Sequence, residues 1–315
     1  MDVTKIAFII LIITSFTILY IVHNTYSITV ASFPLDKTYS ISLPPRLEHI
    51  ILYKNIANET TTTIVLKGPV LQTTIEPAPL IKYDYVIVKS RGVDIYVVSM
   101  IITGIIVFGI LWTYILRELS GRAKTIITLA FLIALVLALA NTLIASLFST
   151  IPYSIAREQK GTLHLLNPAG TIGYPLLPKN YTMYLFKEHI DTEKIMVFES
   201  NRTNFIVIVG TKNFTKGIEM NPSNLFVIHL NKSFIGKKIY IFVLVPTNSN
   251  VKELSYREVS FYEFSAENIN RTRIFLYFIT PTIYLLALII AMFVKKNIEY
   301  YKAKFNKNTQ SISSS

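Results

Sequence analysis

Two long apolar runs joined by a short basic link constrain this chain more than any other feature of its sequence. The runs are residues 95–116 and 125–148, neither contains a charged residue, and residues 117–124 join them. An α-helix needs about 20 apolar residues to cross the hydrocarbon core of a bilayer. Because lipid cannot pair backbone N–H and C=O groups, both runs are expected to be helices. The short link makes them antiparallel, so residues 94–149 are predicted to form a transmembrane hairpin.

Two further apolar runs, residues 6–22 and 274–294, lie near the ends of the chain. The first is longer than the 7–15 apolar residues typical of a signal peptide, and no small-residue cleavage site follows it promptly. We therefore expect an uncleaved helix within residues 1–23, and a cleaved signal peptide remains the alternative. Arg271 and Arg273 precede the last run. The basic segment after it, residues 295–315, is expected to be a disordered cytoplasmic tail.

The positive charge of the chain is concentrated in short segments. The net charge is +12, from 31 Lys and Arg against 19 Asp and Glu. Residues 1–5, 117–124 and 295–315 together hold nine basic residues against three acids, whereas residues 150–273 hold fifteen against ten. Basic residues crowd the short loops on the cytoplasmic side of membrane proteins. This distribution predicts that both termini are cytoplasmic, and it disfavours nucleic acid as a partner because no basic stripe follows one face.

The two polar segments, residues 24–93 and 150–273, have the composition of β domains. Short runs rich in Ile, Val, Thr and Tyr alternate with clusters of Pro, Gly and Asn. The first segment predicts a small sandwich or barrel, and the second an immunoglobulin-like or jelly-roll sandwich. The expected strands are residues 27–33, 37–43, 47–53, 60–67, 71–75, 83–89, 162–166, 182–186, 194–198, 204–209, 225–230, 238–245 and 259–264. Residues 187–194 and 251–257 are highly charged and are expected to be short helices.

The predicted fold class is therefore an integral membrane protein with four transmembrane α-helices and two extracytoplasmic, sandwich-like β domains. Small residues recur at helical spacing along the third span, where another helix can approach closely. The expected helix-packing residues are Ala130, Ala134, Ala138, Asn141, Thr142 and Ala145. For Asn141 we expect a hydrogen bond between helices, with a pore-lining role as the alternative.

Six Asn-x-Ser/Thr sequons fall in the segments that the charge distribution places outside the membrane. Such a sequon is the acceptor for N-glycosylation of an exterior loop. A densely glycosylated face is the expectation, and an accident of an Asn- and Thr-rich composition is the alternative. The predicted sites are Asn58, Asn180, Asn201, Asn213, Asn231 and Asn270.

Motifs for catalysis or metal binding are weak. The chain has no cysteine, and its five histidines are far apart in sequence. Glu188, His189, Asp191 and Glu193 lie within six residues, but a solvated charged turn is the favoured interpretation. Residues 169–174 are rich in Gly but lack the Lys of a phosphate loop, and are expected to be a turn. We expect no catalytic residue, cofactor or metal.

These observations favour a non-enzymatic glycoprotein of the cell envelope that acts by binding. It would serve as an accessory subunit, an adhesion or receptor-like module, or the anchor of a surface assembly. The expected partners are membrane lipids and another protein, or a second copy, bound through the helices and the exterior domains. A transporter or channel component working as an oligomer is the alternative, although such proteins usually carry ionisable residues inside the membrane.

Overall fold

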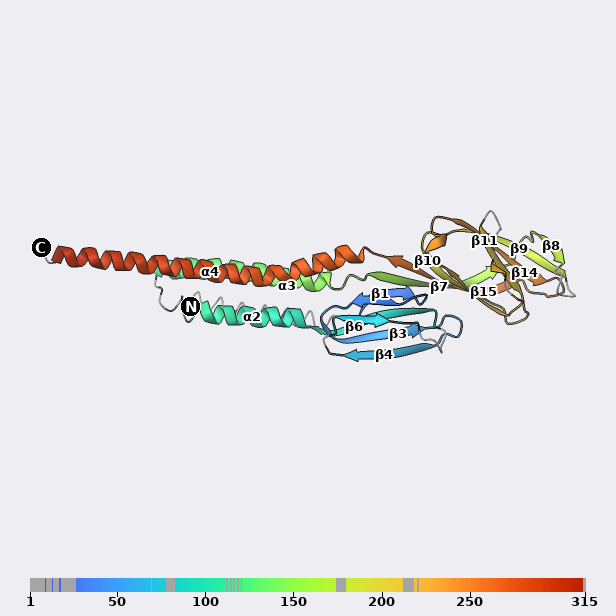
Figure 1. Cartoon of the computed structure of the whole chain (residues 1–315), viewed down its shortest axis with the longest axis horizontal. Helices are drawn as coiled ribbons and strands as arrows, with labels where there is room; N and C mark the ends of the chain where they lie inside the picture. The colour runs from blue at the N-terminus through green and yellow to red at the C-terminus, as the bar shows by residue number, and fades with distance from the viewer. Residues whose placement is uncertain are drawn as a thin grey trace.

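The computed structural model describes residues 27–68, 70–77, 83–111, 121–173, 180–211, 218–219 and 221–313, with single positions at 9, 13, 17, 113, 115, 117 and 119. The molecule is elongated, with long helices at one end and two groups of strands at the other (Figure 1). The prediction of a β-rich chain that also carries long apolar helices is confirmed.

The first β domain is built from six strands in two small sheets. One sheet has the order β1-β6-β3-β4 and the other pairs β2 with β5, all antiparallel. Apolar side chains from both sheets, among them Val30, Ile41 and Ile75, form its core. All six strands were expected from the sequence, and their bounds are β1 Ile28–Pro34, β2 Tyr39–Ser42, β3 Arg46–Lys54, β4 Thr61–Lys67, β5 Gln72–Ile75 and β6 Tyr85–Asp94.

The second β domain is a sandwich. Its two antiparallel sheets have the orders β13-β10-β15-β7 and β12-β11-β14-β9-β8, and they enclose a core that includes Phe198, Phe226 and Val243. Their bounds are β7 Ser154–His164, β8 Gly170–Gly173, β9 Asn180–His189, β10 Glu193–Glu199, β11 Ile206–Thr211, β12 Ile218–Glu219, β13 Leu225–Leu230, β14 Lys238–Pro246 and β15 Glu253–Glu263, with a 3-10 turn, η2, at Lys232–Phe234.

Three helices lie in the described residues: α2 (Ile95–Leu111), α3 (Gly121–Phe148) and α4 (Ala266–Ser313). The segments Lys124–Phe148 and Ala266–Tyr301 are long and apolar enough to cross a membrane, whereas α2 is a shorter apolar helix. The fourth expected span, residues 6–22, lies outside the described residues except for three helical positions. The structure thus has three of the four expected helices in the part of the chain that it describes.

Hydrogen bonds from α2 and α3 support α4 where it contains a proline. Pro281 has no N–H, so the carbonyl of Tyr277, four residues earlier, lacks its usual partner within the helix. The hydroxyl of Tyr96 on α2 donates to this carbonyl at 3.0 Å. The amide of Asn141 on α3 donates to the carbonyl of Leu276 at 2.9 Å. Neighbouring helices therefore satisfy backbone groups in this part of α4, as proline inside an apolar helix requires.

Four expectations about secondary structure were wrong. Two charged segments that were expected to be short helices belong to strands instead: residues 187–189 extend β9, residues 193–194 begin β10 and residues 253–257 begin β15. Long antiparallel ladders with β14, β13 and β7 override the charged local sequence there. Residues 170–173 form the edge strand β8 rather than only a turn. The tail expected to be disordered is helical to residue 313, since no Gly or Pro follows the apolar part of α4 to end it. The second expected span, residues 95–116, is helical to Leu111, and residues 112, 114 and 116 lie outside the described part of the chain.

The contact between Gly104 on α2 and Tyr284 on α4 gives a test of the helix packing. A Cβ atom added to Gly104 would lie 2.6 Å from the hydroxyl oxygen of Tyr284, whose side chain is buried. Gly104→Ala should therefore destabilise the protein by about 1–3 kcal/mol through overpacking. Gly109→Ala is the matched control, because nothing lies within 4 Å of the added atom there. Thermal unfolding in detergent measures both, and equal stability of the two variants would contradict this packing.

Candidate functional site

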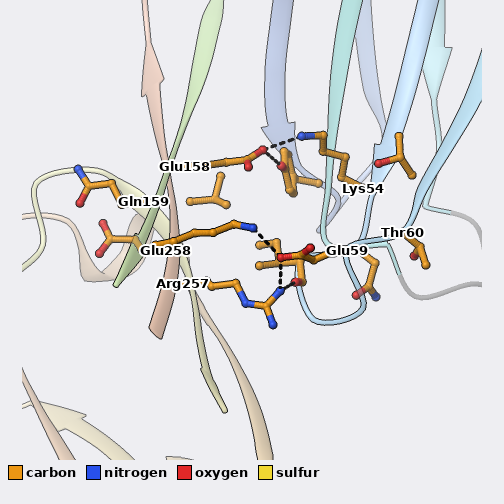
Figure 2. Close-up of a pocket in the computed structure, with 13 residues that line it drawn as sticks. Lys54, Glu59, Thr60, Glu158, Gln159, Arg257 and Glu258 are labelled. Carbon is orange, nitrogen blue, oxygen red and sulfur yellow. Dashed lines mark hydrogen bonds and ion pairs between the residues drawn. The ribbon is translucent and has the colours of Figure 1, made fainter. Parts of the chain in front are cut away.

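A cleft of about 200 Å³ opens where the two β domains meet, and charged side chains from both domains line it (Figure 2). The first domain contributes the end of β3 and the loop after it, with Lys54 and Glu59. The second contributes the neighbouring strands β7 and β15, with Glu158, Lys160 and Arg257. The site therefore exists only when the two domains are in contact.

One half of the cleft is organised around Glu158. Lys54 lies 2.7 Å from its carboxylate, and the hydroxyl of Tyr85 on β6 donates to the same oxygen atom. Burial opposes ionisation of Glu158, but the hydrogen bonds from Lys54 and Tyr85 outweigh it and hold the pKa of this carboxyl below its ordinary value. The carboxylate of the second domain is thus tied to two strands of the first.

The other half is organised around Glu59 and Arg257. The Glu59 carboxylate is 2.6 Å from Lys160 and 3.0 Å from Arg257, and Figure 2 shows Arg257 reaching it from the second domain. Arg257 also donates to the backbone carbonyl of Ile56 at 2.8 Å and pairs with Glu199 at 2.6 Å. The Lys160 and Arg257 pairs lower the pKa of Glu59.

An apolar contact lies beside these ion pairs. Ile56 and Tyr85 of the first domain pack against the outer face of the sheet that contains β10 and β15. Val197 and Val259 of that face are almost completely buried. Six charged side chains line the cleft, and each has an oppositely charged partner: Lys54, Glu59, Glu158, Lys160, Arg257 and Glu258. The arrangement is therefore that of an interface which fixes the two domains against each other.

The acidic cluster considered for metal chemistry does not converge. Glu188 forms an ion pair with Lys194, in which the carboxylate oxygen and the ammonium nitrogen are 2.5 Å apart. His189 and Asp191 are 3.4 Å apart and their side chains are 61% and 78% exposed. Among the described residues, no group of three or more His, Cys, Asp or Glu is arranged to hold a metal ion.

The small and polar residues singled out on α3 lie at two different places. Ala138, Thr142 and Ala145 are completely buried, and Thr142 lies 3.2 Å from Thr280 of α4. Asn141 donates to Thr280 as well as to Leu276. Ala130 and Ala134, nearer the start of α3, instead line an apolar groove between α3 and α4.

This groove has a volume of about 440 Å³ and is lined almost entirely by hydrocarbon. Small residues one helical turn apart form part of both walls: Ala130 and Ala134 on α3, and Ala287 and Ala291 on α4. Larger apolar side chains, including Phe131 and Leu286, complete it. The groove is therefore a concave apolar surface with small residues on both of its helices.

The sequons also differ in their surroundings. Asn58, Asn180, Asn201 and Asn231 are exposed in loops or at a strand end, whereas Asn270 is half-buried inside helix α4. Asn231 accepts hydrogen bonds from the backbone and side chain of Ser233. Asn213 lies outside the described residues.

No local sequence pattern identifies the charged residues of the cleft as a site. Lys54 and Glu158 are more than a hundred positions apart, and only the docking of the domains brings them together. One signal was present: the run Ile195–Phe198 in β10 is apolar without alternation, as in a strand that is covered on both faces. Likewise, no sequence pattern singles out Arg46 and Asp94, which are fully buried.

Comparison with known proteins adds no family to these observations. No protein-family model matches the chain, and no curated protein matches it either.

The domain interface predicts a dependence of stability on pH that Glu158→Gln should reduce. Because the pKa of Glu158 is lower in the folded protein than its ordinary value of about 4.5, the unfolded chain takes up more protons as the pH falls through this range. Stability is then lost progressively below that pH. Glu158→Gln should cost roughly 1–2 kcal/mol at pH 7, since the pair is partly exposed, and should flatten the acid limb of the melting temperature.

Glu253→Gln is the matched control. Glu253 pairs with His164 at 2.9 Å, but both side chains are more than half exposed and belong to one domain. We expect almost no change in stability for this variant. Thermal melts at several pH values between 3 and 7 compare the three proteins, and a Glu158→Gln profile parallel to the wild type would contradict the assignment.

Proposed function

We propose that this chain is a multi-pass membrane protein of the cell envelope that acts by binding, as a non-enzymatic accessory subunit of a membrane complex. In this proposal residues 6–22, α2, α3 and α4 are the four spans, both termini are cytoplasmic, and the β domains are extracellular. The two long apolar helices and the concentration of basic residues in the short segments support this arrangement.

The apolar groove between α3 and α4 is the observation that carries the proposal. In a membrane, helices associate where small residues let their backbones approach closely. Ala134 on one wall and Ala287 on the other provide such positions on both sides of the same groove. We infer that its occupant is one transmembrane helix of a partner subunit, because a helix contacts both walls along its length.

The exterior domains support a binding role in a second way. Ion pairs and an apolar contact join the two β domains. The far end of the second sandwich is therefore held at a fixed distance from the helices (Figure 1). Large apolar side chains are exposed near that end, among them Leu166 at 73% and Ile172 at 39%. These side chains are the positions in the second sandwich at which we expect contact with another protein.

The alternative of a transport component loses its main support. It depended on Asn141 as a polar residue facing a pore, and the Asn141 amide is bonded to Leu276 and Thr280 of α4. These hydrogen bonds give Asn141 a packing role.

The absence of cysteine from the chain provides a direct test of the groove. Single-cysteine variants Ala134→Cys and Ala287→Cys, labelled in native membranes with a maleimide that carries a benzophenone, should form crosslinks to a second polypeptide on irradiation, because the excited benzophenone inserts into C–H bonds of any neighbouring residue. Ala140→Cys is the control, since Ala140 is an exposed residue of α3 that does not line the groove. Ala134→Leu should fill the groove and reduce recovery of that partner at least tenfold, which corresponds to about 1.4 kcal/mol.

The crosslinked product identifies the occupant by its mass. A different protein in the product supports an accessory subunit. A crosslink between two copies of this chain, or no crosslink at either groove position, contradicts the proposal.

Glycosylation of the exterior domains is part of the same proposal and is tested by peptide mass spectrometry of protein from native membranes. We expect glycans on the exposed residues Asn58, Asn180, Asn201 and Asn231, because an exposed acceptor can enter the transferase site. Asn270 should be unmodified, because it is half-buried in a helix. Modification confined to Asn270, or none at the four exposed sites, would contradict the topology with exterior β domains.

A further inference from the structure

Buried polar atoms without partners are concentrated where the first β domain meets the helices. In the part of the chain that the structure describes, eight buried side-chain nitrogen or oxygen atoms lack a hydrogen-bond partner, and six of them belong to residues at this junction. They are Nε and Nη2 of Arg46, Nε2 of His49, Oδ2 of Asp94, Nε of Arg273 and Oη of Tyr277. Buried polar atoms normally have partners, so such a concentration indicates a ligand or ordered water at this place.

Backbone structure brings these residues together from four elements. Arg46 of β3 lies directly opposite Asp94 of β6 in the antiparallel ladder. Asp94 accepts hydrogen bonds from the backbone N–H groups of Tyr96 and Val97 and thereby caps α2. The ring of Tyr96 packs on the ring of Tyr277 in α4, with 4.0 Å between centroids.

Arg273 precedes Tyr277 by one helical turn and completes the cluster. One of its terminal nitrogens donates to the hydroxyl of Tyr153 at 3.0 Å, and the guanidinium lies over the Tyr153 ring. The side chains of Arg46, Asp94 and Arg273 are enclosed, with exposed fractions of 0%, 0% and 4%. Three ionisable side chains are therefore buried within one small junction.

The charges at the junction do not balance. Two guanidinium groups face one carboxylate, and among the described residues no carboxylate oxygen lies within 4.0 Å of a nitrogen of Arg46 or Arg273. Burial raises the pKa of Asp94, and the positive charges of Arg46 and Arg273 oppose this effect. Burial lowers the pKa of Arg46. A buried charge without a counterion is unfavourable, so the excess positive charge requires compensation.

Most of the unpaired atoms at the junction are hydrogen-bond donors. Arg46 Nε and Nη2, Arg273 Nε and Tyr277 Oη are donors, whereas Asp94 Oδ2 accepts when ionised. Water could occupy such a place but would leave the excess charge uncompensated. An oxyanion accepts from several donors at once and supplies the missing negative charge, and guanidinium groups match the geometry of phosphate oxygens.

We propose that this junction binds one phosphate group, held between Arg46 and Arg273. The group comes either from inorganic phosphate or from the headgroup of an anionic phospholipid, because the junction lies where β6 passes into α2 and where the apolar part of α4 begins. Since the site is enclosed, the phosphate remains bound through purification. It stabilises the join between the first β domain and the helices by neutralising the buried charge.

The phosphorus content of the purified wild-type protein tests this proposal. The protein is extracted in a phosphorus-free detergent, exchanged extensively into phosphate-free buffer and measured by elemental mass spectrometry. We expect about one phosphorus atom per chain, as a single occupied site requires. After acid denaturation, phosphorus that partitions into organic solvent identifies a phospholipid, and phosphorus that stays in the aqueous phase as orthophosphate identifies the free ion. Wild-type protein without phosphorus overturns the proposal.

Variants locate the phosphorus at the junction. Arg273→Gln and Arg46→Gln should each lose most of the bound phosphorus. Arg271→Gln and Arg91→Gln are matched controls that should retain it, because their side chains are 76% and 60% exposed. Arg273→Lys keeps the charge if Arg273→Gln fails to fold, and it should retain less phosphorus than Arg271→Lys. Phosphorus that is equal in the junction variants and the controls places it elsewhere and overturns the proposal.

Discussion

The sheet β13-β10-β15-β7 carries apolar side chains on both faces, and the rest of the exterior structure depends on covering the second face. The opposite sheet of the sandwich covers one face through side chains such as Met196 and Phe198. The other face, with Ile195 and Val197, would lie in water without the first β domain. Removing these side chains from water provides the main attraction between the domains. The ion pairs of Glu158 and Arg257 then select one orientation, since charge pairs contribute more to specificity than to affinity.

The join between strands and helices obeys a different constraint. Buried backbone polar groups must find partners in the protein, and here side chains supply them. Asp94 caps the first turn of α2. Tyr96 donates a hydrogen bond to the carbonyl of Tyr277, which lacks a helical partner because of Pro281, and Asn141 donates one to the carbonyl of Leu276. Each partner comes from another element, so the helices hold one another in register. The same region contains the unbalanced charges of Arg46 and Arg273, which are the least expected feature of the junction.

Local sequence pattern predicted much of the fold, because short Val-, Ile- and Thr-rich runs between turn residues encode strands locally. This holds for all six strands of the first domain and for β10, β13 and β14. It failed for Glu253–Arg257, where a ladder with β7 imposes the strand on charged residues. The residues of the cleft could not be predicted from local sequence, because Lys54 contacts Glu158 only after the two domains fold and dock. The stripe on α3 identified Ala138 and Thr142 as candidates for packing, but no local pattern could divide them from Ala134, which lines the groove.

The attachment of the second sandwich to the helices has a mechanical consequence. β7 follows α3 after residues 149–153, and β15 leads into α4 through residues 264–265, so β7 begins and β15 ends beside the helices. They are adjacent and antiparallel, paired from Ser154–Glu263 to His164–Glu253. A pull on the far end of the sandwich would load both strands in the same direction. Tension is then shared between two anchored strands, and their common ladder is neither sheared nor peeled apart.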